Sequence, residues 1–135
     1  MEKEINDVAI IGMGPAGISA AIYLTRSNVN PICFEPGLVG GKLNWVHEIE
    51  NYPSYVGTGK GLAENMSAQV EHFQLDVRKE RVINVNPNDD GTYLLVTDKK
   101  EYIFKSVIIA NGMKEKEYKV KGSEKYNSVG ISRCA

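Results

Sequence analysis

The sequence predicts an α/β fold built on a parallel sheet that begins with a βαβ unit. Two short apolar runs, Val8 to Ile11 and Pro31 to Glu35, have the composition of strands that are buried on both faces. Between them, apolar residues recur at helical spacing from Pro15 to Asn28. Strand, helix and strand within about thirty residues are typical of a βαβ unit.

Two helices are expected. The first begins directly after a glycine-rich turn, and Pro15 suits its first turn because the missing N–H would have no helical partner there. The second follows a long connection, Pro36 to Gly61, which shows no sustained period and is therefore expected to be functional or disordered. It is predicted by the apolar stripe Leu62, Met66, Val70 and Phe73.

The second half of the chain predicts extended structure. Residues 76–86 are expected to be extended and to end in a turn at 86–91. A hairpin is predicted over residues 92–106, and Val107 to Ala110 has the composition of a further buried strand. The charge-dense stretch from Lys114 to Lys125 is typical of a solvated connector.

Composition indicates one globular domain and excludes several classes of function. The 135 residues carry a net charge of −1, so no strong field favours nucleic acid or an anionic membrane. No apolar run approaches the roughly 20 residues that span a bilayer. The polar N-terminus is unlike a secretory signal, and two cysteines form neither a disulfide framework nor a metal site. A cytoplasmic location is the default expectation.

The strongest chemical signal is the motif formed by Gly12, Gly14 and Gly17 between the first strand and the first helix. In this context the three glycines predict a tight turn, close approach of a pyrophosphate, and close packing of helix on strand. Glu35 ends the second strand, where an acid accepts hydrogen bonds from a ribose and disfavours a 2′-phosphate. The motif therefore predicts an adenine dinucleotide, NAD or FAD, and argues against NADP at this site. The alternative is a purely structural glycine turn.

The ordered segments "GMGPAGISAAIYLTR", "GGKL", "IENYPS", "VIIANG" and "VGISRCA" resemble the bacterial two-domain thioredoxin reductases over nearly the whole chain. The resemblance implies a Rossmann-like FAD/NAD(P)-binding domain with an inserted β-meander, and it favours FAD over NAD. It also implies that residues 1–135 are a single, incomplete FAD-binding segment. The NADPH domain and the C-terminal FAD segment would then be absent.

The resemblance implies a function for the intact protein. Hydride would pass from NADPH through FAD to a Cys-Ala-x-Cys disulfide and on to thioredoxin, in a homodimer. Cys134 and Ala135 match the first half of that motif, so Cys134 is the candidate catalytic residue. A chain that holds only one of the two cysteines is not expected to turn over by itself. Cys33, by contrast, is expected to be a small core residue.

Residue by residue, the resemblance places most of the site along the glycine turn, the loop after the second strand and the end of the last parallel strand. Glu35 would bind the adenosine ribose, Asn51 would approach the flavin ring, and the backbone of Val82 would meet adenine. The implied cofactor-binding residues are Gly12, Gly14, Pro15, Ala16, Glu35, Pro36, Gly40, Gly41, Lys42, Leu43, Asn51, Val82, Ala110, Asn111 and Gly112.

Three positions depart from the family pattern. Ser54 replaces a glycine, and Asn111 replaces a threonine whose hydroxyl organises the backbone. Lys42 replaces a glutamine, and a cation near the flavin would favour its anionic reduced form. Two rival functions remain open: a ferredoxin or flavodoxin reductase that uses NADPH without a redox disulfide, and a non-catalytic dinucleotide-binding module.

Overall fold

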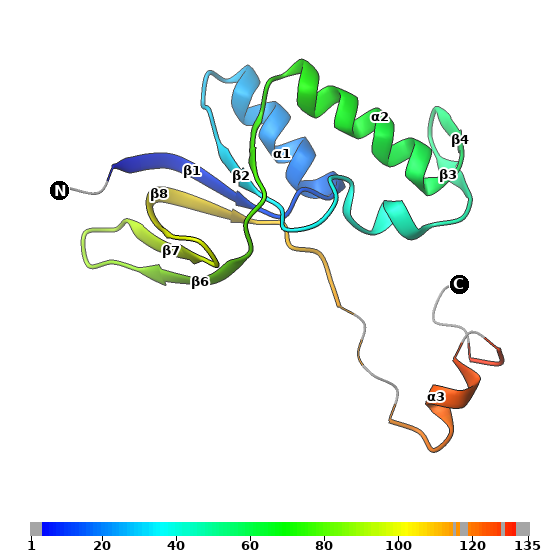
Figure 1. Cartoon of the computed structure of the whole chain (residues 1–135). Coiled ribbons are helices and arrows are strands. Elements are labelled where there is room, and N and C mark those ends of the chain that lie inside the picture. The colour runs from blue at the N-terminus through cyan, green and yellow to red at the C-terminus, as the bar shows by residue number, and fades with distance from the viewer. Residues whose placement is uncertain (1–3, 115, 117–118, 128, 132–135) are drawn as a thin grey trace.

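The computed structural model describes residues 4–114, 116, 119–127 and 129–131. Its main feature is a six-stranded sheet in the order β5-β2-β1-β8-β7-β6 (Figure 1). The strands of this sheet are β1 (Ile5–Ile11), β2 (Ile32–Phe34), β5 (Asp76–Arg78), β6 (Val82–Pro87), β7 (Tyr93–Thr97) and β8 (Glu101–Ile109). The remaining elements are α1 (Pro15–Arg26), η1 (Gly41–Trp45), β3 (Ile49–Tyr52), β4 (Tyr55–Gly57), α2 (Gly59–His72) and α3 (Ser123–Tyr126).

Four adjacent strands, β5, β2, β1 and β8, are parallel, and β1 lies inside the sheet between β2 and β8. Strand β1, helix α1 and strand β2 form the predicted βαβ unit. Strands β6, β7 and β8 form an antiparallel meander at the other side of the sheet. The predicted fold class, a Rossmann-like parallel sheet with an inserted β-meander, is therefore confirmed.

Alternating residues of β1 and β2 divide the core between the two faces of the sheet. Ile10 and Cys33 point to the face that α1 and α2 cover, where they pack with Ile18, Ala21 and Val70 (Figure 1). The Cys33 thiol is fully buried, and desolvation raises its pKa to about 12. A thiol with that pKa is protonated at neutral pH, so Cys33 is a core residue, as expected.

The opposite face is covered by aromatic side chains of the meander. Phe34 of β2 makes edge-to-face contacts with Tyr102 and Phe104 of β8, with ring centroids 5.2 and 6.0 Å apart. Ala9 and Leu95 belong to the same buried cluster. Side chains of β8 thus contact Phe34 of β2 across the intervening strand β1. The parallel and antiparallel parts of the sheet therefore share one core.

The predicted hairpin strand and the predicted buried strand after it are one element. Strand β8 runs without a break from Glu101 to Ile109, and its register with β1 extends from Ile5 opposite Ile103 to Ile11 opposite Ile109. Its first residues also pair antiparallel with β7. The expectation that its last part is fully buried is wrong, because Ile109 is 69% exposed. Ile109 pairs with Ile11, which packs against the aromatic cluster, so Ile109 lies on the face of the sheet that the helices do not cover.

The extended segment predicted over residues 76–86 is two strands on opposite edges of the sheet. Between β5 and β6 the chain passes from one edge to the other, and buried Glu80 fixes the crossing. The Glu80 carboxylate accepts hydrogen bonds from the Thr97 hydroxyl at 2.7 Å and from the Tyr102 hydroxyl at 2.9 and 3.0 Å. These partners satisfy a carboxylate that is only 7% exposed.

The long connection before α2 is ordered and contains elements that the sequence did not predict. Its first part forms the 3₁₀ helix η1, and its second part forms the two-stranded hairpin β3–β4 beside α2 (Figure 1). Ser54 in the hairpin turn has a φ of 64°, a left-handed conformation that glycine adopts more readily. A glycine at this turn position, as in the family pattern, meets the same backbone requirement.

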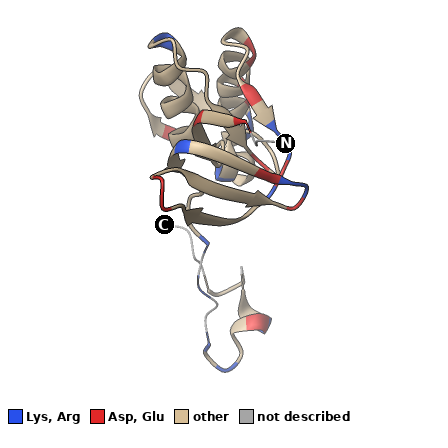
Figure 2. Ribbon diagram, turned by 90° about the vertical axis from the view of Figure 1, so that its left-hand side faces the viewer, with Lys and Arg blue, Asp and Glu red and all other residues tan. Residues whose placement is uncertain are grey.

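The described residues after Gly112 extend away from the sheet and carry the four-residue helix α3 (Figure 1). Those in the predicted connector are largely exposed. Acidic and basic residues are interspersed along the elements, in keeping with 17 acidic and 16 basic side chains in the sequence (Figure 2). Within the described residues, no helix has the length and apolar character needed to cross a membrane.

Gly17 fits α1 against the glycine turn and generates a stability prediction. A Cβ at Gly17 would lie 1.8 Å from the carbonyl oxygen of Gly12, so Gly17→Ala forces the helix away from the strand end. We expect this change to lower the free energy of unfolding in urea by about 1–3 kcal/mol, although alanine favours helix more than glycine does. Gly14→Ala is the matched control, because its Cβ would meet nothing closer than the Gly41 Cα at 4.0 Å. Equal stability of the two variants would contradict the packing role of Gly17.

Candidate functional site

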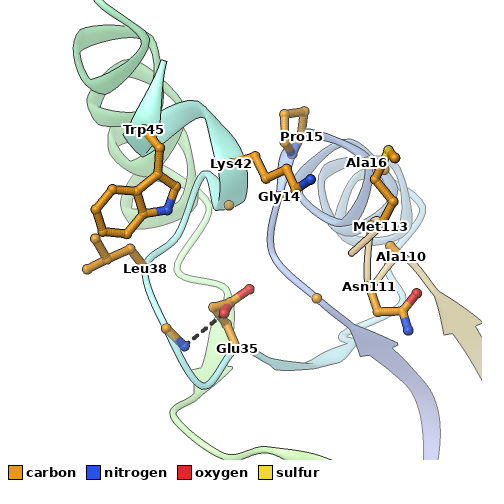
Figure 3. Close-up of a pocket in the computed structure, with 14 residues that line it drawn as sticks. Gly14, Pro15, Ala16, Glu35, Leu38, Lys42, Trp45, Ala110, Asn111 and Met113 are labelled. Atoms are coloured by element: carbon orange, nitrogen blue, oxygen red, sulfur yellow. Dashed lines mark hydrogen bonds between the residues drawn. The ribbon is translucent and has the colours of Figure 1, made fainter. Parts of the chain in front are cut away.

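A pocket of about 670 Å³ lies at the carboxyl ends of three adjacent parallel strands (Figure 3). Gly12, Glu35 and Ala110 follow the last residues of β1, β2 and β8. The volume is within the roughly 300–1,000 Å³ typical of ligand sites, and the carboxyl edge of an open parallel sheet is where such sites form. The pocket is lined by Gly12, Gly14, Pro15, Ala16, Glu35, Gly37, Leu38, Gly41, Lys42, Trp45, Ala110, Asn111, Gly112 and Met113.

Gly12 joins the strand ends beneath the pocket. Its N–H donates to the Phe34 carbonyl at 2.9 Å, while the neighbouring Ala110 N–H donates to the Ile11 carbonyl at 2.8 Å. Its φ is +95°, and a Cβ would lie 2.5 Å from the Ala110 carbonyl oxygen. Only glycine therefore fits this turn, as the sequence predicts for the first glycine of the motif.

The first turn of α1 opens onto the pocket without a side-chain cap. Its N-cap is Gly14, which has no side chain to accept a hydrogen bond. At α2, by contrast, the Thr58 hydroxyl accepts from the Gly61 N–H at 3.0 Å. The first amides of a helix have no helical acceptor and lie at the positive end of its dipole. The N-terminus of α1 can therefore bind an anion from the pocket.

Glu35 connects the two loops that form the floor of the pocket. One oxygen of its carboxylate accepts from the Met13 N–H at 2.9 Å. The other accepts from the Gly37 N–H at 2.8 Å, the bond drawn as a dashed line in Figure 3. A carboxylate has about four acceptor positions, so two backbone bonds leave capacity for hydroxyl donors of a ligand. Glu35 thus combines a structural role with the geometry of an acceptor facing the pocket.

The loop that carries η1 is fixed by backbone contacts. The Gly40 N–H donates to the Met13 carbonyl at 2.7 Å, and the Asn44 amide donates to the carbonyl oxygens of Val39 and Gly41 at 3.0 Å each. A Cβ at Gly41 would lie 3.2 Å from the Gly14 Cα. The two glycine loops therefore approach each other closely at the pocket.

Exposed side chains on this loop form part of the rim. Trp45, the only tryptophan of the sequence, is 80% exposed and lies beside Leu38 in the view of Figure 3. Lys42 extends across the pocket toward Gly14 and Pro15 (Figure 3). The Asn44 hydrogen bonds hold the backbone of this loop, while the indole of Trp45 stays exposed at the rim.

The structure brings together ten of the predicted cofactor-binding residues around this pocket. They are Gly12, Gly14, Pro15, Ala16, Glu35, Gly41, Lys42, Ala110, Asn111 and Gly112. Their role in binding a cofactor stays a prediction. Five other predicted residues, namely Pro36, Gly40, Leu43, Asn51 and Val82, are not among the residues that line it.

The structure places three of these five in surroundings of their own, while Pro36 is exposed in the loop after β2 and Leu43 is half-buried in η1. Gly40 is buried against α2, where a Cβ would lie 2.5 Å from the Ala63 Cβ, so it has a packing role. Asn51 lies exposed on β3, and Val82 packs against the aromatic face of the core. Cys134, the predicted catalytic residue, lies outside the described residues.

Four residues that line the pocket were not predicted as site residues: Gly37, Leu38, Trp45 and Met113. Leu38 and Trp45 lie in the connection that had no periodic pattern, and an exposed aromatic in such a loop was the only sequence signal available. Within the described residues, no group of three or more His, Cys, Asp or Glu side chains could hold a metal ion. The pocket combines an anion-binding helix end, an acceptor carboxylate, one cation and an exposed indole.

The pocket and sheet agree with comparisons with known proteins. The sequence model of the pyridine nucleotide-disulphide oxidoreductase family matches residues 6–135. The thioredoxin reductase of Helicobacter pylori is 39% identical over 132 residues, which cover 96% of this chain and 42% of that protein. The chain therefore spans about two fifths of the length of this relative.

Solved structures give the same result. The thioredoxin reductase of Lactococcus lactis superposes with a TM-score of 0.83 at 36% identity, over 96% of this chain and 43% of that one. That of Streptococcus pyogenes superposes with a TM-score of 0.81 at 37% identity, over 98% of this chain and 44% of that one. The match to the family over residues 6–135, together with the Rossmann-like sheet, shows that the chain belongs to the pyridine nucleotide-disulphide oxidoreductases.

Proposed function

We propose that this chain is the FAD-binding portion of an NADPH-dependent thioredoxin reductase. The observation that carries the proposal is the uncapped first turn of α1, which opens onto a pocket at the carboxyl ends of β1, β2 and β8. That position suits the diphosphate of a dinucleotide. The thioredoxin reductases among the relatives support FAD as the dinucleotide.

The residues present fit this cofactor. The amides of Ala16 and Gly17 would hold the diphosphate, and the Glu35 carboxylate would accept from the ribose hydroxyls with the acceptor positions that the Met13 and Gly37 amides leave open. A carboxylate here repels a 2′-phosphate, so NADPH would bind elsewhere in the intact protein. Bound FAD supplies the capacity to accept a hydride and pass on electrons one pair at a time.

The rest of the reaction belongs to the intact protein and is part of the proposal. NADPH would reduce the flavin, a disulfide formed by Cys134 and a second cysteine of the Cys-Ala-x-Cys motif would take up the electrons, and thioredoxin would receive them by thiol–disulfide exchange. We propose a cytoplasmic homodimer as its working form. This chain contributes the flavin side of that sequence and is not expected to turn over alone.

The test is reconstitution with FAD. We expect the purified chain to retain flavin absorbance after incubation with FAD and desalting, and to bind NAD more weakly in competition. Preferential binding of NAD, with no retained flavin, would favour a dinucleotide-binding module and contradict the proposal. For the full-length protein, NADPH-dependent reduction of thioredoxin that is lost in Cys134→Ser would support the disulfide step, whereas unchanged thioredoxin reduction in this variant would contradict it. Reduction of ferredoxin or flavodoxin, with none of thioredoxin, would favour the rival reductase.

Gly14 provides the sharpest variant for the placement of the diphosphate. We expect Gly14→Ala to raise the Kd for FAD about tenfold or more, because a methyl group on the N-cap enters the space that a phosphate would occupy. The loss of stability should be small, since this Cβ meets no other protein atom closer than 4.0 Å and only the weaker N-cap preference of alanine remains. Gly130→Ala is the matched control, because nothing lies within 4 Å of its Cβ and it does not line the pocket. Equal FAD affinity for both variants would refute the placement.

Trp45 provides a spectroscopic test of the same site. Because it is the only tryptophan and lines the rim, we expect FAD to quench its fluorescence and to protect it from iodide. In the free protein, iodide should quench freely, since the side chain is 80% exposed. Trp45→Phe establishes that the signal comes from this residue. Unchanged emission and iodide access at saturating FAD would place the ligand elsewhere.

A further inference from the structure

Lys42 lies where a second electrostatic contact to the bound ligand can form. It belongs to η1, directly after Gly41, whose added Cβ would lie 3.2 Å from the Gly14 Cα. Figure 3 shows its side chain extending across the pocket toward Gly14 and Pro15, where α1 begins. The ammonium group and the first amides of α1 therefore approach the same part of the pocket from two different loops.

The two ionisable side chains among the described residues that line the pocket have opposite charges and lie in different parts of it. Among the described residues that line it, Lys42 is the only cation and Glu35 the only anion. Glu35 already accepts two backbone hydrogen bonds on the floor of the pocket, whereas Lys42 lies on the side of the α1 N-terminus (Figure 3). An anionic ligand group bound at the α1 N-terminus would therefore lie on the same side of the pocket as Lys42.

We propose that Lys42 binds the diphosphate of the dinucleotide from the side opposite the α1 amides. This inference rests on the proposed function. A diphosphate diester carries about two negative charges at neutral pH, while a helix N-terminus supplies the equivalent of only about +0.5. Lys42 adds a full positive charge, which raises the compensation from roughly one quarter to about three quarters of the ligand charge.

Hydrogen bonds hold the loop that carries Lys42, so the starting point of its side chain is fixed relative to the pocket. The Asn44 amide bonds to the carbonyl oxygens of Val39 and Gly41, and the Gly40 N–H bonds to the Met13 carbonyl. The backbone on both sides of Lys42 is therefore held in place before any ligand binds. The backbone of this loop therefore need not be ordered on binding, which keeps the entropic cost low.

The test compares two probes that share the adenosine diphosphate diester, namely FAD and ADP-ribose, by calorimetry. We expect Lys42→Gln to raise the Kd for both probes by a similar factor, about tenfold or more, because a hydrogen bond to a charged group is lost. We expect Lys42→Arg to retain most of the affinity. The difference between wild type and Lys42→Gln should shrink as NaCl rises from about 50 mM to about 500 mM, since salt screens the ion pair.

Lys60→Gln is the matched control. Lys60 is an exposed lysine on α2, 4.0 Å from Glu64, and it does not line the pocket, so its replacement should leave both affinities unchanged. Thermal melts of each variant show whether the fold is retained.

Each outcome decides between the possibilities. A loss of affinity for FAD with none for ADP-ribose would overturn the inference and assign Lys42 to the flavin ring. Equal affinities of Lys42→Gln and wild type for both probes would overturn it as well. If the wild-type chain bound neither probe, the proposed function itself would fail, and this inference with it.

Discussion

The absence of a side chain at Gly12 is the constraint on which the rest of the site depends. Its N–H bonds to the end of β2, the space of its missing Cβ is occupied by the backbone after β8, and its carbonyl oxygen touches Gly17 of α1. Three strands and a helix therefore meet around one residue. Any larger residue would separate the strand ends, and the pocket would lose its floor and its helix N-terminus together.

Glu35 shows how the fold and the proposed site use one group. The sequence predicts it as a ligand for a ribose, and the structure shows that its carboxylate also joins the loops at Met13 and Gly37. The acceptor is therefore oriented before a ligand arrives, which lowers the cost of ordering it on binding. The same preorganisation applies to η1, where side-chain and backbone hydrogen bonds fix the loop that carries Lys42.

Local patterns predicted the βαβ unit and α2, since their apolar periodicity directly reflects the face that they bury. Tertiary pairing decided the elements that were misjudged. Residues 76–86 form two strands because Glu80 binds partners on β7 and β8, and β8 is continuous because it has β1 along one side. For a similar reason Leu38 was missed, and whether Trp45 contacts a flavin or only holds the loop was left open. Their position beside the glycine turn depends on contacts across the fold, and no local spacing encodes it.

The pairing of β1 with β8 has a consequence for biosynthesis. Strand β1 lies inside the sheet and is translated before the other five strands, yet its neighbour β8 begins at Glu101 and is translated after them. At about 5–20 residues per second, the nascent β1 waits several seconds with an unpaired apolar edge. Chaperones that shield such edges would therefore act on β1 before β8 emerges.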